Sequence, residues 1–145
     1  MASKRSSLAS MRKMVRQAML NSDPIQELLG DSGRVYSSHV QDSEVNNVQF
    51  PSIVFELLSG SSRWHGYVQS STLEIFAYSK IGSSECVDLY DQIYESLQHT
   101  RLVEGGVLVD DASTAVIFEV QCPVQGFNRE IGAWFMRGRW QLNGT

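Results

Sequence analysis

The chain has 145 residues, of which 42% are hydrophobic and 19% charged, with a formal net charge of −4 at pH 7. This is the composition of an ordinary globular domain and excludes an intrinsically disordered chain. Its longest apolar runs are a few residues, far short of the roughly 18 needed for a spanning helix, so we expect no membrane partner.

Two cysteines, Cys86 and Cys122, lie far apart, and His39, His65 and His99 share no ligand spacing with them or with each other. This arrangement favours two buried free thiols in a reducing compartment over a disulfide or a metal site. No secretory signal segment is visible, so we expect the protein to stay in the cytosol where it is made.

Residues 6–20 have the periodicity of an amphipathic helix. Its apolar arc consists of Leu8, Met11, Met14, Val15, Ala18 and Met19. Arg5, Arg12 and Arg16 fall together on another face, and residues 1–20 contain no acid. Such a segment can mimic a transit peptide or bind nucleic acid, but a solvated or subunit-facing helix is favoured. We assign residues 1–22 to this helix, as part of a single domain whose remainder is 23–145.

A second, short helix follows. Asp23 is predicted to cap it, Pro24 to occupy its first position and Gly30 to end it. Val35 and Tyr36 then begin a short extended stretch.

Two strands are predicted next. The first covers Ser52 to Ser59 and ends in a turn or flexible loop at residues 59–62. The second covers about Thr72 to Tyr78, with alternate residues on opposite faces. One face carries Leu73, Ile75 and Ala77; the other carries Glu74, Phe76 and Tyr78.

A second long helix is predicted to be capped by Ser83 or Ser84. Its apolar stripe is Cys86, Leu89, Tyr90, Ile93 and Leu97. Asp88, Asp91 and Glu95 cluster on the opposite side. A solvated face is favoured over a carboxylate or metal site, because no histidine accompanies them at helical spacing.

The C-terminal third predicts strands. A brief strand is expected at Val107 to Val109, a longer one at Thr114 to Cys122 and a connection at Pro123 to Asn128. The residues expected to point inward are Val116, Phe118, Val120 and Cys122.

The last strand runs from about Arg129 to Leu142. One face carries Trp134, Met136, Trp140 and Leu142; the other carries Phe135, Arg137 and Arg139. Lone strand acids mark either a shared polar seam or solvent-facing positions: Glu56, Glu74 and Glu119. The element order predicts an α+β fold, with an antiparallel or mixed sheet of about four to five strands and two main helices on one face.

Known catalytic patterns do not occur. Gly105 and Gly106 stand without a GxGxxG motif or a Walker lysine, and no GxSxG elbow is found. Arg137 and Arg139 with Phe135 can form a platform for single-stranded nucleic acid. However, a pI near 5.3 argues against dedicated nucleic-acid binding, and an acidic neighbouring subunit explains the arginines as well. We predict no enzyme and no cofactor.

One progression of short motifs carries a family signal. It reads D-P-x-x-x-L-L-G at 23–30, R-V-Y at 34–36 and P-x-I-V-F-x-x-x-S-G at 51–60. This progression resembles the tail-completion, or tail-terminator, proteins of long-tailed bacteriophages, over about residues 15–142. The basic N-terminal helix is longer than the family pattern.

The resemblance implies an α+β fold and a hexameric ring that caps the tail tube and joins it to the head-side connector. Implied partners are further copies of the chain, the tail tube protein and the connector or stopper protein, with genomic DNA passing through the channel. The implied location is the virion tail or neck, with assembly in the host cytoplasm. The family offers no catalytic residues, and Ile53, Val54 and Phe55 map to the core.

A closed ring requires a heterologous contact between two different surfaces of neighbouring subunits. The hypothesised surfaces are the basic face (Arg5, Arg12 and Arg16) and the acidic face (Asp88, Asp91 and Glu95). These faces either meet between neighbours or line opposite ends of the ring. Arg137 and Arg139 are expected to face the channel or a neighbour. Trp64, His65 and Tyr67 are expected to contact the tail tube or connector, although aromatic residues in such a loop can equally fold back onto the sheet.

Two alternatives remain open at this stage. One is another head–tail joining or neck subunit. The other is a small α+β regulatory or nucleic-acid-binding domain that uses its basic N-terminus as an arm, for which salt-dependent DNA binding is the signature.

Overall fold

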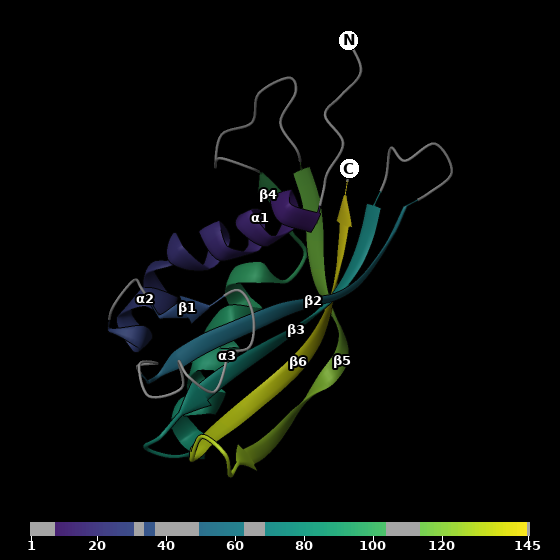
Figure 1. Ribbon diagram of the computed structural model, residues 1–145. Helices are drawn as coiled ribbons and strands as arrows, with labels where there is room; N and C mark the ends of the chain where they lie inside the picture. The colour runs from purple at the N-terminus through teal and green to yellow at the C-terminus, as the bar shows by residue number, and fades with distance from the viewer. Residues whose placement is uncertain (1–7, 31–33, 37–49, 63–68, 104–113, 145) are drawn as a thin grey trace.

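The computed structural model describes residues 8–30, 34–36, 50–62, 69–103 and 114–144. Within these ranges the chain forms two layers, a twisted sheet and a layer of helices against one of its faces (Figure 1). The helices are α1 (Leu8–Leu20), α2 (Asp23–Leu29) and α3 (Ser83–Leu97). The described helices are therefore the two main helices and the one short helix that the sequence predicted.

The helix starts differ from the predicted caps. Asp23 is the first residue of α2 rather than its cap, and Ser22 precedes it without a side-chain capping bond. Ser83 is likewise the first residue of α3, after Gly82. Instead, the Ser79 hydroxyl accepts hydrogen bonds from the N–H groups of Ile81 and Gly82. The end of β3 therefore stabilises the turn that precedes α3. The prediction for Gly30 is confirmed: it ends α2 with a φ of 75°.

The described strands form one sheet. They are β1 (Val35–Tyr36), β2 (Ser52–Ser62), β3 (Gln69–Ser79), β4 (Thr100–Val103), β5 (Thr114–Asn128) and β6 (Ala133–Gly144). Their spatial order is β1-β2-β3-β6-β5-β4, with β1 parallel to β2 and every other pair antiparallel. The α+β class is confirmed, but the mixed sheet has six strands rather than four to five.

Two predicted strand ends are wrong for the same reason. Residues 59–62 continue β2 because they pair with Gln69–Thr72 of β3, although their composition is that of a turn. Residues 123–128 continue β5 because they pair with β6. Proline at position 123 is tolerated because no strand of the described chain pairs with the other edge of β5 there. The strand β4 was not predicted, and the predicted strand at 107–109 lies outside the described residues.

The main core lies between the helices and the sheet. α1 contributes Met11, Met14, Val15 and Met19, and α3 contributes Leu89, Tyr90, Ile93 and Leu97. The facing strands contribute Ile53, Phe55, Leu73, Ile75, Ala77, Ala115, Ile117, Trp140 and Leu142. The periodicities predicted for both long helices and for β3 are therefore confirmed.

The predicted orientation of β5 is wrong. Ala115 and Ile117 are the buried apolar residues of this strand, while Val120 and Cys122 are exposed. The cause is the pairing of Ile117 with Leu142, which turns the odd-numbered residues toward the helices. Consequently only one of the two cysteines, Cys86, is buried, and its burial raises the thiol pKa to about 11.

Candidate interaction surfaces

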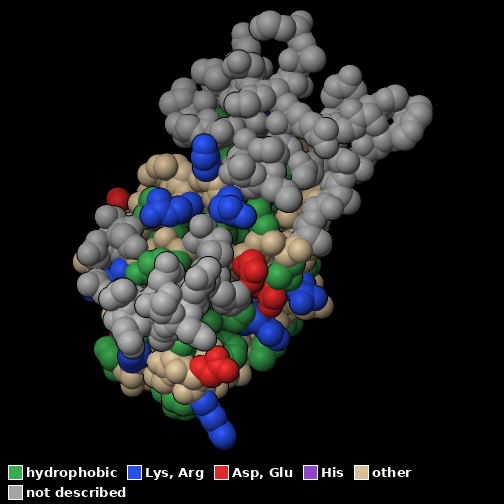
Figure 2. Space-filling model, viewed as in Figure 1, with side chains coloured by type: hydrophobic (Ala, Val, Ile, Leu, Met, Phe, Trp, Pro, Cys, Tyr) green, Lys and Arg blue, Asp and Glu red, His purple; other side chains and the backbone are tan. Residues whose placement is uncertain are grey.

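The basic face of α1 is built by helical spacing. Arg12 and Arg16 are four residues apart and therefore on one side of the helix, and both are exposed. Figure 2 shows a group of basic side chains over this helix. Arg16 Nε donates to the carbonyl oxygen of Val35 at 3.3 Å, which positions the side chain beside β1. Neither arginine forms an ion pair with a described acid, and Arg5 lies outside the described residues.

The acidic face lies on α3. Asp88, Asp91 and Glu95 are all exposed, opposite the buried stripe of the same helix. Among the described residues, no three histidine, cysteine, aspartate or glutamate side chains are placed to hold a metal ion. No ion pair joins this acidic face to Arg12 or Arg16 within the described part of one chain.

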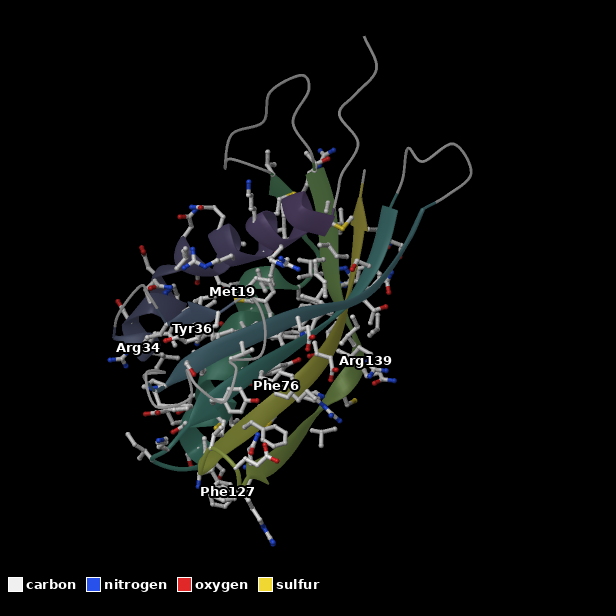
Figure 3. All side chains as sticks on the ribbon, in the orientation of Figure 1. Met19, Arg34, Tyr36, Phe76, Phe127 and Arg139 are labelled. Atoms are coloured by element: carbon white, nitrogen blue, oxygen red, sulfur yellow. The ribbon has the colours of Figure 1, made fainter. Side chains whose placement is uncertain are left out.

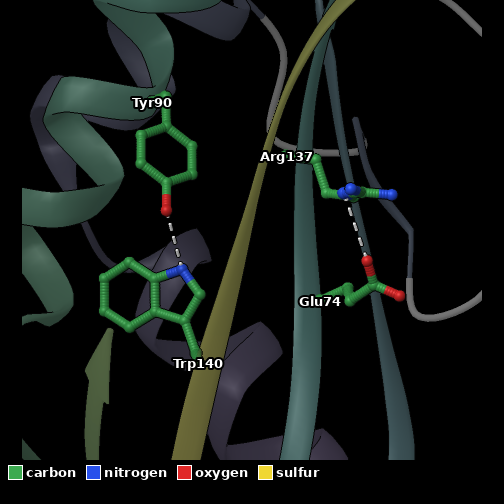
Figure 4. A network of polar contacts seen from close by, with 4 residues as sticks. All are labelled: Glu74, Tyr90, Arg137 and Trp140. Atoms are coloured by element: carbon green, nitrogen blue, oxygen red, sulfur yellow. Dashed lines mark hydrogen bonds and ion pairs between the residues drawn. The ribbon is translucent and has the colours of Figure 1, made fainter. Parts of the chain in front are cut away.

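The open face of the sheet, which the helices leave uncovered, is charged along its middle. Arg137 Nε lies 3.4 Å from Glu74 Oε2, so these residues of β6 and β3 form an ion pair. Figure 4 shows this pair on one side of the sheet and the buried pair of Tyr90 and Trp140 on the other. Arg139 lies opposite Glu74 in register and is exposed (Figure 3), without an ion pair to a described acid.

An aromatic cluster occupies the rest of the open face. The rings of Phe76 and Tyr78 stack at 5.5 Å, and that of Phe135 lies 5.9 Å from Phe76. Phe50 meets Tyr78 edge-on at 6.4 Å, and Lys80 Nζ lies 4.9 Å from the centre of the Phe50 ring. Burial raises the pKa of Tyr78 to about 12. Sequence alternation placed these aromatic residues on the second face of their strands, but only the pairing of β3 with β6 unites them.

A polar network joins α3 to the sheet. Trp140 Nε1 donates to the Tyr90 hydroxyl at 3.1 Å, and that hydroxyl donates to Glu119 Oε2. Glu119 is held in turn through its N–H, which donates to Gln98 Oε1 at 2.8 Å. Burial first, and then the hydrogen bond and charge of Glu119, raise the pKa of Tyr90. Of the lone strand acids, Glu119 thus belongs to a polar seam, which α3, β5 and β6 share.

A groove runs between α1 and β4. Its volume is about 420 Å³, and the hydroxyls of Ser22 and Ser96 lie 2.8 Å apart within its lining. The remaining lining residues are Met14, Gln17, Ala18, Asn21 and Thr100–Val103. Among the described lining residues none is an acid, a histidine or a cysteine, so the hydroxyls of Ser22 and Ser96 have no such side chain beside them in the described lining.

The predicted loop contacts Trp64, His65 and Tyr67 lie outside the described residues. In the described part of the chain, no helix is long and apolar enough to cross a bilayer.

No family model matches the sequence, and no curated protein matches it. Among solved structures, the fold is similar to that of a chain in the "Virion of native gene transfer agent (GTA) particle", with a TM-score of 0.65. The similarity covers 95% of this chain and 98% of the other at 12% sequence identity. The two chains share a fold over nearly their whole lengths.

Proposed function

We propose that this chain is a structural virion protein that assembles into a hexameric ring, caps the tail tube and joins the tail to the head-side connector. The observation that carries the proposal is the fold shared, over nearly the whole of both chains, with a component of a virion. The order of the motifs at 23–30, 34–36 and 51–60 supports the assignment to the tail terminator in particular.

The charge distribution supports a contact between unlike surfaces. Basic residues on α1 and acidic residues on α3 are exposed and form no ion pair with each other within the described chain. In a ring, Arg12 and Arg16 of one copy meet Asp88, Asp91 and Glu95 of the next. Exposed ion pairs of this kind fix register and partner choice more than they add affinity.

The remaining surfaces receive roles in the same ring. Arg137 and Arg139 face the DNA channel or a neighbour, and Trp64, His65 and Tyr67 contact the tail tube or connector. No catalytic step is assigned to the protein. Its place is the tail or neck of the virion, after assembly in the host cytoplasm.

Electron microscopy and light scattering of the purified protein at its highest soluble concentration test the ring. Six-fold rings are expected for the wild type and a smaller particle for Arg12→Glu/Arg16→Glu. The control Lys80→Glu/Arg129→Glu makes the same charge change on exposed residues outside both helices and leaves the rings intact. Rings that persist in the first variant exclude the helix contact, whereas a wild-type monomer with salt-dependent DNA binding replaces the ring by the nucleic-acid-binding alternative.

The loop contact needs whole particles. Trp64→Ala is expected to yield tails that fail to join heads, and normal joining in this variant eliminates the assigned contact.

A further inference from the structure

The groove between α1 and β4 is bounded by one face of a helix and by the edge of a strand. Its lining residues on α1 are spaced three or four positions apart and therefore lie on one side of that helix: Met14, Gln17, Ala18 and Asn21. On β4, the consecutive residues Thr100–Val103 all line it. Since a strand turns alternate side chains to opposite faces, this consecutive lining means that β4 presents its edge to the groove. Figure 1 shows β4 next to α1.

The edge of β4 that faces the groove has backbone groups to offer. β4 is the last strand in the sheet order and, within the described chain, pairs only with β5. In an antiparallel pair, alternate residues point their N–H and C=O groups away from the partner strand. The volume of about 420 Å³ shows that the space beside this edge is unfilled. At ~3.3 Å per residue, β4 is long enough to pair with a segment of about three or four residues.

The α1 wall of the groove supplies further polar groups. Gln17 Nε2 donates to Asn21 Oδ1 at 3.0 Å, and both residues are exposed. This bond leaves Gln17 Oε1 as an acceptor and Asn21 Nδ2 as a donor. Met14 and Leu102 are buried and give the groove an apolar base. Hydrogen-bonding groups along both walls and apolar contacts between them are what an extended peptide requires.

One described lining residue carries a charge. Arg101 is exposed and forms no ion pair with a described acid. Its guanidinium matches a carboxylate in charge and geometry, so the groove is complementary to a segment with an acidic side chain. Single-stranded nucleic acid fits less well, because none of the described lining residues is aromatic and stacking on aromatic rings supplies much of such binding.

We propose that this groove binds an extended, acidic segment of another protein, which adds as a strand to the edge of β4 and places a carboxylate at Arg101. Main-chain hydrogen bonds hold the segment, while Arg101 and the apolar base select its side chains. The surface is separate from the proposed ring contact, because Arg12 and Arg16 fall on the other side of α1 at helical spacing. A single copy of the chain is therefore expected to bind the segment as well as a ring does.

Nuclear magnetic resonance of the isotope-labelled full chain tests the proposal. The probe is the glutamate peptide acetyl-Val-Thr-Glu-Val-Thr-amide at millimolar concentration, whose β-branched residues favour an extended backbone. Shifts are expected in the amide signals of Thr100–Val103 and of α1 from Met14 to Asn21. The lysine peptide acetyl-Val-Thr-Lys-Val-Thr-amide is expected to bind about 3–10-fold more weakly, because its charge repels Arg101.

A charge swap tests the contact with Arg101. Arg101→Glu is expected to weaken binding of the glutamate peptide by about 3–10-fold and to strengthen binding of the lysine peptide. Arg129→Glu makes the same charge change at an exposed residue between β5 and β6 and leaves both affinities unchanged. A well-dispersed spectrum shows that each variant folds. Unchanged affinities in folded Arg101→Glu contradict the carboxylate contact.

The backbone pairing has its own test. Methylation of the main-chain nitrogens of the glutamate peptide removes its N–H donors and is expected to abolish binding. Equal binding of the methylated peptide overturns strand addition to β4, and the absence of shifts with the unmethylated peptide overturns the peptide site altogether. If a short oligothymidylate shifts the same amide signals and the peptide does not, the groove is a nucleic-acid site instead. Each of these results leaves the proposed ring standing.

Discussion

The two faces of the sheet are built from the same strands but hold different chemistry. On the helix-covered face, the strand residues form one apolar core, and the polar network of Tyr90, Glu119 and Trp140 lies on the same face. On the open face, an aromatic cluster at one end meets the charged side chains of Glu74 and Arg137. Strand alternation alone thus gives one sheet a face with a continuous apolar core and a face on which buried aromatic residues lie beside exposed charges.

The largest effect is expected when a phenylalanine on each face of the sheet is replaced by alanine and the two losses of stability are compared. Phe55 on the covered face is fully buried, and Phe55→Ala is expected to lower the free energy of unfolding by about 3–5 kcal/mol. Phe135 on the open face is only partly buried, and Phe135→Ala is expected to cost roughly half of that. Urea unfolding at low protein concentration gives both values. Equal losses would contradict the difference in burial between the two faces.

The second largest effect is expected when Gly138 and Gly126 are each replaced by alanine. Neither glycine has a positive φ. A Cβ on Gly138 would overlap the Tyr90 hydroxyl, which Glu119 and Trp140 hold in place. Gly138→Ala is therefore expected to destabilise by about 1–3 kcal/mol. A Cβ on Gly126 would lie 2.6 Å from Cζ of the Phe135 ring, which is partly exposed and can swing aside.

Gly126→Ala is accordingly expected to be nearly neutral. The loss of unfolded-state freedom favours alanine by about 0.4–1 kcal/mol, which offsets the cost of moving the ring. Thermal unfolding of both variants measures the contrast. In the double variant Gly138→Ala/Tyr90→Leu, the loss is expected to be smaller than the sum of the two single losses, because the overlap is gone. An additive loss would show that the overlap is not the cause.

Local periodicity was enough to predict part of this arrangement. The stripe of α3 and the alternation of β3 follow from residues within a few positions of each other, so both could be read from the sequence. Asp88, Asp91 and Glu95 could be placed on the exposed side of α3 for the same reason. Composition failed at residues 59–62, where small polar residues continue a strand because β3 supplies the pairing.

The missed features depend on contacts between distant parts of the chain. The aromatic cluster exists because β3 pairs with β6, and the orientation of β5 is set by its register with β6. Nothing local to Thr114–Cys122 distinguishes the two orientations, since apolar residues occur at both odd and even positions. The strand order follows from pairings between distant segments, which local patterns do not encode.

The smallest effect on stability at neutral pH is expected from the tyrosine hydroxyls of the two faces, because they titrate only in alkaline solution. Burial raises the pKa of Tyr78 on the open face to about 12, from an ordinary 10.0. A tyrosine whose pKa is higher in the folded state favours folding fully below pH 10, and this contribution is lost as the pH rises from 10 to 12. Unfolding free energy is therefore expected to fall across this window, and less steeply in Tyr78→Phe.

Tyr90 on the covered face has a pKa raised further by the same cause, burial, with Glu119 adding to it. Its hydroxyl should consequently ionise only as the protein unfolds, after Tyr78 has begun to titrate in the folded state. Ultraviolet absorbance of tyrosinate, recorded with circular dichroism along one alkaline titration, tests this order. If Tyr90→Phe and Tyr78→Phe remove absorbance over the same pH range while the protein is still folded, the two hydroxyls share one environment. The covered face would then be no better sealed from water than the open one.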